Sequence, residues 1–407
     1  MAFIRRHVQK AVKGMSSQFA AVFVTGPRQA GKTTMLEKTA AGAVYVTLDD
    51  PVAMQNANLE PGNFLKLYQP PVIIDEIQYA PGLFPYIKMF ADKAKKKKLF
   101  YLTGSQQFRM MKNVSESLAG RVGIIQMLGL SMREIKKINF DTPFIPDKKY
   151  FLAAEKFKQE ISYRNLFLHI QKGFMPALHA GKVSPQAFYS SYVKTYIERD
   201  VRDLTQVGDE LKFLKFLSVA AARTGQMLNY TSIASDVGIS LPTAERWVSV
   251  LCASGIAYLL QPFFNNRIKR AVKSPKLYFL DTGLAAYLSR WNSAQALESG
   301  AMSGAFFETF VIAEIIKSYY NAGISEPPLY YYRDKDKKEI DLIIEGDGVL
   351  HPLEIKKTSN PASEDIKNFS VLDNIAGIKR GSGGIICNYE KLSGISALDY
   401  SIPVSYL

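Results

Sequence analysis

The sequence predicts an α/β protein with a parallel sheet at the N-terminal end, a helical middle part and a second α/β unit at the C-terminal end. The first 130 residues or so alternate short runs rich in Val, Ile, Phe and Tyr with helix-length segments, which is the pattern of βαβ units. From about 151 to 225, apolar residues recur at steps of three and four, as on one face of a helix. After about residue 300, a helical pattern again precedes short strands.

Each strand of the N-terminal sheet is expected where a short apolar run occurs. These runs occupy 20–26, 43–49, 70–76, 98–105 and 122–128. The segment 138–150 contains two prolines and mixed polarity, so we interpret it as a connector to the helical part.

Composition limits the class of protein. The chain has 407 residues, of which 47% are hydrophobic, and this length suggests two or three domains. No run reaches the roughly 18 apolar residues that span a bilayer, so no membrane partner is expected. Cys252 and Cys387 are too few for a disulfide framework or a cysteine-based zinc site, and a cytoplasmic location is expected. A net charge of +14 favours phosphate-rich partners such as nucleic acid.

A glycine-rich motif follows the first expected strand. The residues "GPRQAGKT" match the P-loop pattern G-x-x-x-x-G-K-[ST], in which glycines let backbone N–H groups surround phosphates. Lys32 would reach the β- and γ-phosphates, and Thr33 would bind Mg²⁺. The expected nucleotide-binding residues of this segment are Gly26, Pro27, Arg28, Gln29, Ala30, Gly31, Lys32, Thr33 and Thr34.

An acidic strand end is the second part that a P-loop site requires. The run "VIIDE" supplies it: Asp75 would join the Mg²⁺ shell, and Glu76 would act catalytically by polarising the attacking water. The next strand ends in "YLTGS", where Thr103 or Ser105 could contact the γ-phosphate or serve as a turn residue. Arg121 could be an arginine finger for a neighbouring copy, which would imply a homo-oligomer, or a solvated arginine.

Taken together, "GPRQAGKTTML", "IIDEIQYAP", "LTGSQQF" and "LAGRV" resemble the AAA-type P-loop ATPases of bacteria and archaea that carry a C-terminal domain of unknown function. The resemblance continues through "YIERDVRDL", "KLYFLDTGLAAYL" and "GAFFETFVIAEI", so it covers most of the chain. It implies that the nucleotide is ATP, bound with Mg²⁺.

The segment 228–260 has the pattern of a winged helix. Thr231 could cap a short helix that ends near Val237, and Pro242 suits the first turn of a second helix. Two strands follow, joined by a basic loop, and six basic residues stand against Asp281 over 261–290: Arg267, Lys269, Arg270, Lys273, Lys276 and Arg290. Such a module could contact duplex DNA, mostly through its backbone and with Arg246 as the main candidate to read bases, or it could bind protein.

Charged residues with regular spacing follow near the C-terminal end. In "EIDLII" and "LEIKK", two strands joined at "EGDG" would bring Asp341 beside Glu354 and Lys356. Two carboxylates and a lysine on one face suit a metal site that activates water against a phosphodiester. Glu308, on a helix upstream, could pack beside them.

This arrangement resembles the core of PD-(D/E)xK nucleases. The resemblance implies that Asp341 and Glu354 bind metal, that Glu308 supports it, and that Lys356 positions the water, with Glu354 and Lys356 acting catalytically. Ile340 stands where that family often has proline. A nuclease-like fold that binds without cleaving, or a sheet edge with solvated charges, would give the same spacing.

The expected domains are an ATPase domain over 1–140, a helical connector or lid over 141–226, a winged-helix-like domain over 227–292 and a nuclease-like domain over 293–407. The sequence is compatible with an ATPase that drives a DNA-binding, nuclease-like part. It is also compatible with an ATP-dependent binding switch without cleavage, or with a remodeller of proteins.

Overall fold

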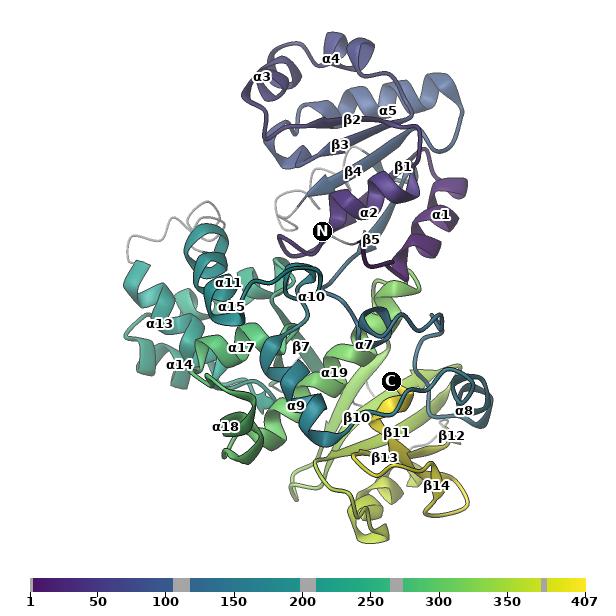
Figure 1. Cartoon of the computed structure of the whole chain (residues 1–407), viewed down its shortest axis with the longest axis vertical. Coiled ribbons are helices and arrows are strands. Elements are labelled where there is room, and N and C mark those ends of the chain that lie inside the picture. The colour runs from purple at the N-terminus through teal and green to yellow at the C-terminus, as the bar shows by residue number, and fades with distance from the viewer. Residues whose placement is uncertain (1–2, 105–117, 198–209, 264–273, 375–378) are drawn as a thin grey trace.

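The computed structural model describes residues 3–104, 118–197, 210–263, 274–374 and 379–407 (Figure 1). The predicted sensor position Ser105 and the wing residues Arg267, Lys269, Arg270 and Lys273 lie outside these ranges. An N-terminal domain occupies one end of the long axis in Figure 1, and the rest of the chain occupies the other end.

The N-terminal domain is a parallel sheet covered by helices on both faces. Its elements are α1 (Val8–Gln18), β1 (Ala21–Thr25), α2 (Lys32–Thr39), β2 (Val44–Thr47), α3 (Pro51–Leu59), α4 (Pro61–Leu67), β3 (Val72–Asp75), the 3₁₀ helix η1 (Ile77–Tyr79), α5 (Leu83–Ala94), β4 (Phe100–Gly104) and β5 (Val122–Gln126). Within the described ranges, the strand order is β2-β3-β4-β1-β5 and each pair is parallel. All five predicted strands are confirmed, each a few residues shorter than its apolar run.

Successive side chains of β1 pack into two hydrophobic cores, one on each face of the sheet. Val22 and Val24 of β1 pack with α1 and α2, whereas Phe23 between them packs with α4 and α5 on the other face. This alternation follows from the two-residue period of a strand. Each such buried side chain contributes about 1.5–3 kcal/mol, so both helical layers are needed to hold the strand ends that carry the P-loop.

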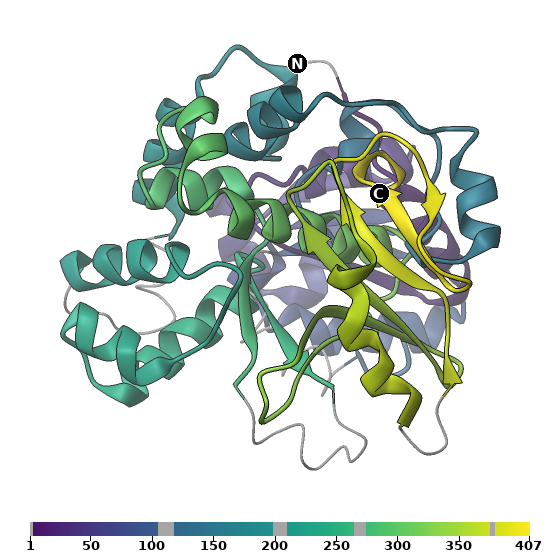
Figure 2. The same cartoon turned by 90° about the horizontal axis from the view of Figure 1, so that it is seen from below.

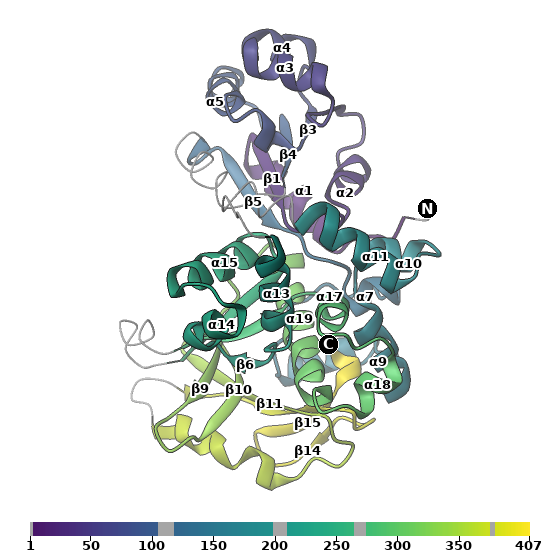
Figure 3. The same cartoon turned by 90° about the vertical axis from the view of Figure 1, so that its left-hand side faces the viewer.

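A helical part follows the first sheet. It contains α7 (Met132–Ile135), α8 (Lys148–Ala154), α9 (Tyr163–Lys172), α10 (Pro176–Ala180), α11 (Pro185–Tyr192), the π-helical turn η2 (Val193–Ile197) and α13 (Glu210–Ala221). α10 and α11 reach back toward the N-terminal domain (Figure 3). A Cβ added to Gly31 would lie 3.8 Å from Pro176 Cγ, so the start of α10 is next to the P-loop.

The two helices and two strands expected from residue 228 to the segment "KLYFLD" are present, and their identity as a winged helix stays a prediction. The elements are β6 (Gln226–Met227), α14 (Tyr230–Val237), α15 (Leu241–Ala253), β7 (Ala257–Pro262) and β8 (Lys276–Phe279). The predicted cap was wrong, because the side chain of Asn229, one residue before α14, accepts the Ser232 N–H and Thr231 lies inside the helix. Pro242 does occupy the first turn of α15.

In the described ranges, the C-terminal part adds three α-helices, two 3₁₀ helices and the rest of a mixed sheet. They are α17 (Thr282–Leu288), α18 (Ala294–Ser299), α19 (Ser303–Asn321), β9 (Leu329–Arg333), β10 (Glu339–Gly346), β11 (Val349–Lys356), η3 (Ser363–Asn374), β12 (Lys379–Arg380), β13 (Gly383–Cys387), β14 (Ser393–Gly394), β15 (Asp399–Pro403) and η4 (Val404–Tyr406). The hairpin predicted at "EGDG" is confirmed. Asp347 and Gly348, both with positive φ, form its two-residue loop.

One sheet joins β6, β7 and β8 to the C-terminal strands. In the described part of the chain, its order is β14-β15-β13-β11-β10-β9-β7-β8-β6, and β12 pairs with β11. The pairing of β7 with β9 crosses the boundary that the sequence suggests near residue 292. Figure 2 shows these C-terminal strands from below, in front of the N-terminal domain.

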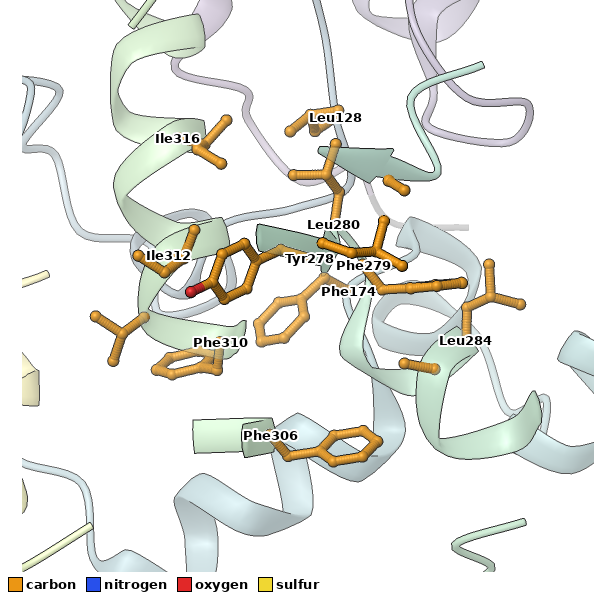
Figure 4. Packing of buried hydrophobic residues seen from close by; sticks show 14 of the residues in the cluster. Leu128, Phe174, Tyr278, Phe279, Leu280, Leu284, Phe306, Phe310, Ile312 and Ile316 are labelled. Atoms are coloured by element: carbon orange, nitrogen blue, oxygen red, sulfur yellow. The ribbon is translucent and has the colours of Figure 1, made fainter. Parts of the chain in front are cut away.

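A continuous hydrophobic core also joins these parts. Figure 4 shows Leu128, which follows β5, beside Leu280 of the winged helix and Ile316 of α19. All three belong to the same buried cluster as Phe174 and Phe310. The segment that leaves the N-terminal domain is therefore packed into the core of the C-terminal part.

Candidate functional site

The P-loop has the backbone geometry that a phosphate cradle needs. It connects β1 to α2, and three of its residues have positive φ: Gly26 at 147°, Gln29 at 59° and Gly31 at 88°. A Cβ added to Gly26 would lie 1.9 Å from Met127 O, so this position accepts only glycine. The loop can therefore turn its N–H groups inward at the start of α2, where the helix dipole favours an anion.

The side chains of the loop are arranged as the motif requires. Lys32 is buried, and its Nζ donates to Gly26 O and Pro27 O, both at 3.0 Å. Its ammonium thus lies within the loop. The Arg28 guanidinium donates to the Tyr79 hydroxyl at 3.4 Å, Ala30 is fully buried, and Thr34 is exposed on α2.

Thr33 and Asp75 meet, as predicted, at the carboxyl ends of β1 and β3. Thr33 Oγ1 donates to Asp75 Oδ1 at 2.8 Å, and Thr103 Oγ1 donates to the same oxygen. Tyr45, which the sequence analysis missed, donates its hydroxyl to Asp75 Oδ2 at 3.3 Å. Burial and the nearby Asp75 raise the pKa of Tyr45 to about 12, so this hydroxyl keeps its proton. A hydroxyl beside a carboxylate is the oxygen donor set that Mg²⁺ prefers, and these residues therefore fit the ion.

Glu76 follows Asp75 in a left-handed conformation, with φ at 54°. Its backbone N–H donates to Thr103 Oγ1 at 3.2 Å, and Gln78 Nε2 donates to its carboxylate. Thr103 thus binds both acidic residues and fixes the turn between them. A role for Thr103 as a γ-phosphate sensor stays a prediction.

Arg121 lies far from this chain's P-loop. It directly precedes β5, and its carbonyl accepts the N–H of Ala21 at the amino end of β1. The P-loop follows the opposite, carboxyl end of β1. Arg121 Nε pairs with Asp92 at 2.6 Å on the surface. An arginine finger for its own nucleotide is therefore not formed, and action on a neighbouring copy stays a prediction.

Arg6 is a further residue of the site that sequence reasoning missed. Its guanidinium is buried and donates to three carbonyl oxygens: Ala30 and Leu128, both at 2.8 Å, and Gly129 at 3.1 Å. Arg6 Nε also pairs with Glu134 at 3.0 Å. Burial alone would raise the pKa of Glu134, but Arg6 and His7 hold it below its usual value. No short-range sequence pattern predicts this contact, since the partners come from separate segments of the chain.

The same segment is held from the other side by α19. The backbone N–H of Met132 donates to Glu314 Oε2 at 2.8 Å, and Lys317 Nζ donates to Leu130 O at 2.9 Å. Lys317 also pairs with Glu314 at 2.8 Å. Residues 128–134 therefore link the P-loop, through Arg6, to the long helix of the C-terminal part.

Part of the predicted basic surface lies on α15 and after α17. Arg246 on α15 and Arg290 after α17 are exposed. Lys276, which we counted among the wing cations, is instead buried at the start of β8. It faces the C-terminal carboxylates, because β8 lies in the same sheet as β10.

Those carboxylates form a cluster around Lys276, which we call the Lys276 cluster and define as Lys276, Glu308, Glu339, Asp341, Glu354 and Lys356. Lys276 Nζ lies 2.7 Å from Glu339, 3.2 Å from Glu308 and 3.7 Å from Asp341. The predicted proximity of Asp341, Glu354 and Lys356 is present: Lys356 Nζ lies 3.4 Å from Glu354 Oε2. Asp341 Oδ2 also accepts the N–H of Ile355, next to Glu354.

Burial and mutual repulsion shift the pKa values in this cluster. Burial and Asp341 together raise the pKa of Glu354 to about 9, although Lys356 opposes them. Burial raises the pKa of Glu308 to about 7 against the effect of Lys276. Burial would lower the pKa of Lys276, but the surrounding carboxylates raise it above its usual value. Lys276 is therefore a permanent cation here.

The structure shows no ready-made metal centre at Asp341, Glu354 and Glu308, and their role as metal ligands stays a prediction. Among the residues that the structure describes, no group of three or more His, Cys, Asp or Glu side chains could hold a metal ion. The physical reason is the ammonium of Lys276, which approaches both Glu308 and Asp341 and supplies the positive charge between them.

Comparisons with known proteins agree with this organisation. Residues 18–136 match an AAA domain family, residues 163–295 match the domain of unknown function DUF8612, and residues 303–407 match the domain of unknown function DUF4143. Uncharacterized proteins of Mycobacterium tuberculosis and Mycobacterium bovis are each 29% identical over 364 residues, which cover 89% of this chain and 76% of the relative.

Two solved structures are more distant. A Walker-type ATPase of Pyrococcus abyssi is 13% identical with a TM-score of 0.41, covering 71% of this chain and 98% of that one. A signal transduction ATPase with numerous domains from Pyrococcus horikoshii, which carries a tetratricopeptide repeat sensor, is 14% identical with a TM-score of 0.27, covering 80% and 48% respectively. In the parts of the chain placed by the structure, no helix is long and apolar enough to cross a membrane.

The P-loop geometry, the paired Thr33 and Asp75, and the match over residues 18–136 lead to one assignment. Residues 18–136 form a P-loop domain that matches the AAA domain family, and the regions that follow match two domain families of unknown function.

Proposed function

We propose that the protein hydrolyses ATP and uses its nucleotide state to switch the winged helix and the C-terminal sheet between binding states. The observation that carries the ATPase part is the hydrogen bond from Thr33 to Asp75 beside the buried Lys32. These residues would hold Mg²⁺-ATP, and the metal would supply positive charge at the phosphate oxygens. The loop amides and Lys32 would bind the phosphate chain, exchanging the carbonyl contacts of Lys32 for phosphate contacts.

Glu76 is the residue that would orient the attacking water. Its carboxylate can accept a proton from that water, and its hydrogen bond from Gln78 fixes one of its oxygens. Thr103 holds the backbone at this turn, so the carboxylate approaches from the end of β3 rather than from a flexible loop. The geometry supports an in-line attack at the γ-phosphate, with Lys32 and the loop amides stabilising the developing charge.

Two substitutions test the ATPase. Lys32→Ala should abolish ATP binding measured by isothermal titration calorimetry, whereas Glu76→Gln should retain binding and lower kcat by about 100-fold or more. Lys38→Gln, on the exposed face of α2 and outside the P-loop motif, is the matched control and should leave both properties unchanged. Normal turnover in both Lys32→Ala and Glu76→Gln would refute the assignment.

DNA is the partner that we propose for the switch. The net charge of +14 and the exposed Arg246 on the second helix of the winged helix support a phosphate-binding surface. Binding of a duplex should weaken steeply as salt rises, differ between the ADP and ATP-analogue states, and weaken further in Arg246→Ala. Absence of binding at low salt would favour a protein partner instead.

A second candidate function is metal-dependent cleavage of that DNA. The observation that favours it is the gathering of Asp341, Glu354 and Lys356 on adjacent strands. The test is plasmid nicking with Mg²⁺ or Mn²⁺. If the wild-type protein and the double variant Asp341→Ala, Lys356→Ala give the same products, the region binds without cutting.

A further inference from the structure

A cavity of about 380 Å³ lies among the helices of the middle part, and neither the proposed ATPase nor the proposed DNA contact at Arg246 uses it. Its walls come from α11, the π-helical turn η2, α13 and α17, and α17 contacts both α11 and α13 (Figure 3). The described residues that line it include none of the P-loop and none of the Lys276 cluster. A cavity of this size lies within the range of about 300–1,000 Å³ that holds small organic ligands.

The charge of this cavity is positive. Lys194 of η2 and Arg290, which follows α17, both line it, whereas none of its described lining residues is acidic. Neither of these two cations forms an ion pair with another residue that the structure describes. The hydroxyl of Ser190 and the amide of Asn292 also line the cavity, and both groups can donate hydrogen bonds. The cavity therefore suits an anion.

Arg290 occupies a backbone position that normally favours glycine. Its φ is 63°, in the left-handed region. Its N–H donates to Tyr287 O at 3.2 Å, and the N–H of Trp291 donates to Ala286 O at 2.8 Å. These two bonds form the Schellman motif that ends α17, and glycine avoids strain at the position that Arg290 fills. An arginine at this position despite the strain indicates a role for its side chain at the cavity.

Lys194 lies on an equally uncommon piece of backbone. Residues Val193–Ile197 form a π-helical turn directly after α11. Such turns are rare and occur frequently at functional sites. Val193 and Lys194 of this turn both line the cavity. Two unusual backbone features therefore meet at one cavity, and each of them carries one of its two cations.

Apolar side chains on the same walls limit the kind of anion. Leu214 of α13 and Tyr287 of α17 line the cavity together with the cations. A small inorganic ion gains nothing from such side chains, whereas burying the apolar body of an organic ligand against them is favourable. A phosphate monoester carries a charge of about −1.5 to −2 at pH 7 and three acceptor oxygens, so it matches two cations better than a carboxylate does.

We propose that this cavity binds a small organic phosphate, that is, a phosphate monoester on an apolar or flat body. Lys194 and Arg290 bind the phosphate oxygens, and the guanidinium can donate two parallel hydrogen bonds. Leu214 and Tyr287 cover the organic body of the ligand. The inference goes beyond the proposed function, since the site requires neither ATP at the P-loop nor DNA.

Isothermal titration calorimetry on the full chain tests the site with phenyl phosphate as the probe. The wild type should bind the probe at least about tenfold more tightly than it binds inorganic phosphate, which lacks the ring. Arg290→Gly and Lys194→Gln should each weaken binding of the probe by at least about tenfold, since each removes a charge-assisted contact. Lys215→Gln is the matched control: Lys215 is exposed on α13 outside the cavity, so its loss should change the affinity by less than about twofold.

Thermal unfolding separates a role in ligand binding from a structural one. Glycine removes the backbone strain at position 290, so Arg290→Gly should melt at or above the Tm of the wild type although it binds the probe more weakly. If Arg290 serves only the fold, this variant will instead show a lower Tm and an unchanged affinity, and the proposal fails.

The P-loop is the other phosphate-binding site of the chain, and Lys32→Ala removes its cation. This variant should bind phenyl phosphate as the wild type does, whether or not the protein hydrolyses ATP. Loss of the probe in Lys32→Ala would place it at the P-loop and overturn the proposal. A wild type that does not bind the probe, or that binds inorganic phosphate equally well, would overturn it too, as would wild-type affinity in Lys194→Gln.

Discussion

Asp75 accepts hydrogen bonds from three hydroxyl groups beside the P-loop. Thr33 and Thr103 donate to one of its oxygens, and Tyr45 donates to the other. Hydrogen bonds of this kind fix the orientation of a metal-binding carboxylate before the ion arrives. The Thr103 hydroxyl also accepts the N–H of Glu76, so it links the metal-binding acid to the proposed catalytic one.

Thr103→Val should separate these effects. The substitution keeps the shape of the side chain but removes the hydroxyl, so the N–H of Glu76 and the carboxylate of Asp75 each lose a hydrogen-bond partner. We expect the free energy of unfolding to fall by about 1–3 kcal/mol and kcat to fall about tenfold, with ATP affinity changed by less than about threefold. Urea unfolding and steady-state kinetics check this, and Thr103→Ser should restore both values. Unchanged kcat in Thr103→Val would contradict the positioning role.

A pH dependence of stability follows from Glu354. Its pKa is about 9 in the folded chain, because of burial and of Asp341, and about 4.3 in an unfolded chain. Between these values the folded state holds a proton that the unfolded state has released. The free energy of unfolding should therefore fall as pH rises from about 4.3 to 9, by up to about 1.4 kcal/mol per pH unit. Glu308, with a pKa of about 7, adds to this fall in the lower part of the window.

Urea unfolding from pH 6 to pH 9 measures that slope. Glu354→Gln has no ionisable group at this position. Its free energy of unfolding should therefore fall less steeply with pH than that of the wild type, and the difference should correspond to most of one proton. Glu364→Gln is the matched control, because Glu364 is 79% exposed and pairs with Lys367 on the surface. Equal slopes in the wild type and Glu354→Gln would show that Glu354 is already ionised when folded.

At the scale of elements, the P-loop depends on one close backbone contact. Gly26 ends β1 against Met127, which follows β5, and a Cβ there would lie 1.9 Å from the Met127 carbonyl oxygen. The loop therefore keeps its shape only if β1 and β5 stay in register and position 26 has no side chain.

Gly26→Ala should accordingly abolish ATP binding and destabilise the N-terminal domain by more than about 2 kcal/mol. Gly14→Ala is the control, because Gly14 lies in α1 with no atom within 4 Å of an added Cβ. That change should be neutral or stabilise the helix by up to about 1 kcal/mol. Calorimetric titration with ATP and thermal unfolding measure both effects; retained ATP binding in Gly26→Ala would show that the contact with Met127 can relax.

Elements with a strong local pattern were predictable from the sequence. The five strands of the first sheet lie in mostly apolar runs, and the hairpin at 345–348 has a two-residue turn signal, so their positions required no knowledge of distant partners. The cap of α14 was assigned wrongly to Thr231, because Asn229 is an equally suitable capping residue two positions earlier. The pairing of β7 with β9 could not be foreseen, since the sequence contains no signal for which edges of two sheets meet.

At the scale of the whole molecule, the residues that sequence reasoning missed are those that join distant segments. Arg6 contacts Glu134, 128 positions later, and Lys276 contacts Glu308, Glu339 and Asp341. Each was an ordinary basic residue in its local sequence: Arg6 lies just before α1, and Lys276 begins the strand that follows a basic loop. Their roles come from carbonyl and carboxylate groups that only the folded chain brings together.

The hydrogen bonds of Arg6 connect the P-loop to the segment that enters the C-terminal core. The carbonyl of Ala30 in the P-loop and the carbonyls of Leu128 and Gly129 accept from the same guanidinium. Glu134 completes the arrangement, and α19 holds the following residues through Glu314. A movement of the P-loop on binding ATP would therefore act directly on the segment that enters the C-terminal core.

A double-mutant cycle tests that connection. Arg6→Met leaves Glu134 buried without its cation, and we expect it to lower the free energy of unfolding by about 3–5 kcal/mol. Adding Glu134→Gln removes the unpaired charge, so the double variant should recover at least about 1 kcal/mol of that loss. Urea unfolding of the four proteins gives the coupling energy. Additive losses would mean that the two side chains act separately.

The same proteins report on communication between the domains. In the wild type, ATP should slow amide hydrogen exchange in α19 as well as in the P-loop, because residues 128–134 connect them. In the Arg6→Met, Glu134→Gln double variant, ATP should still protect the P-loop, but the effect on α19 should disappear. If ATP protects α19 in that variant as much as in the wild type, the P-loop and α19 are coupled through another contact. One example is α10, which lies beside Gly31. Loss of protection at both places would instead assign Arg6 to ATP binding itself.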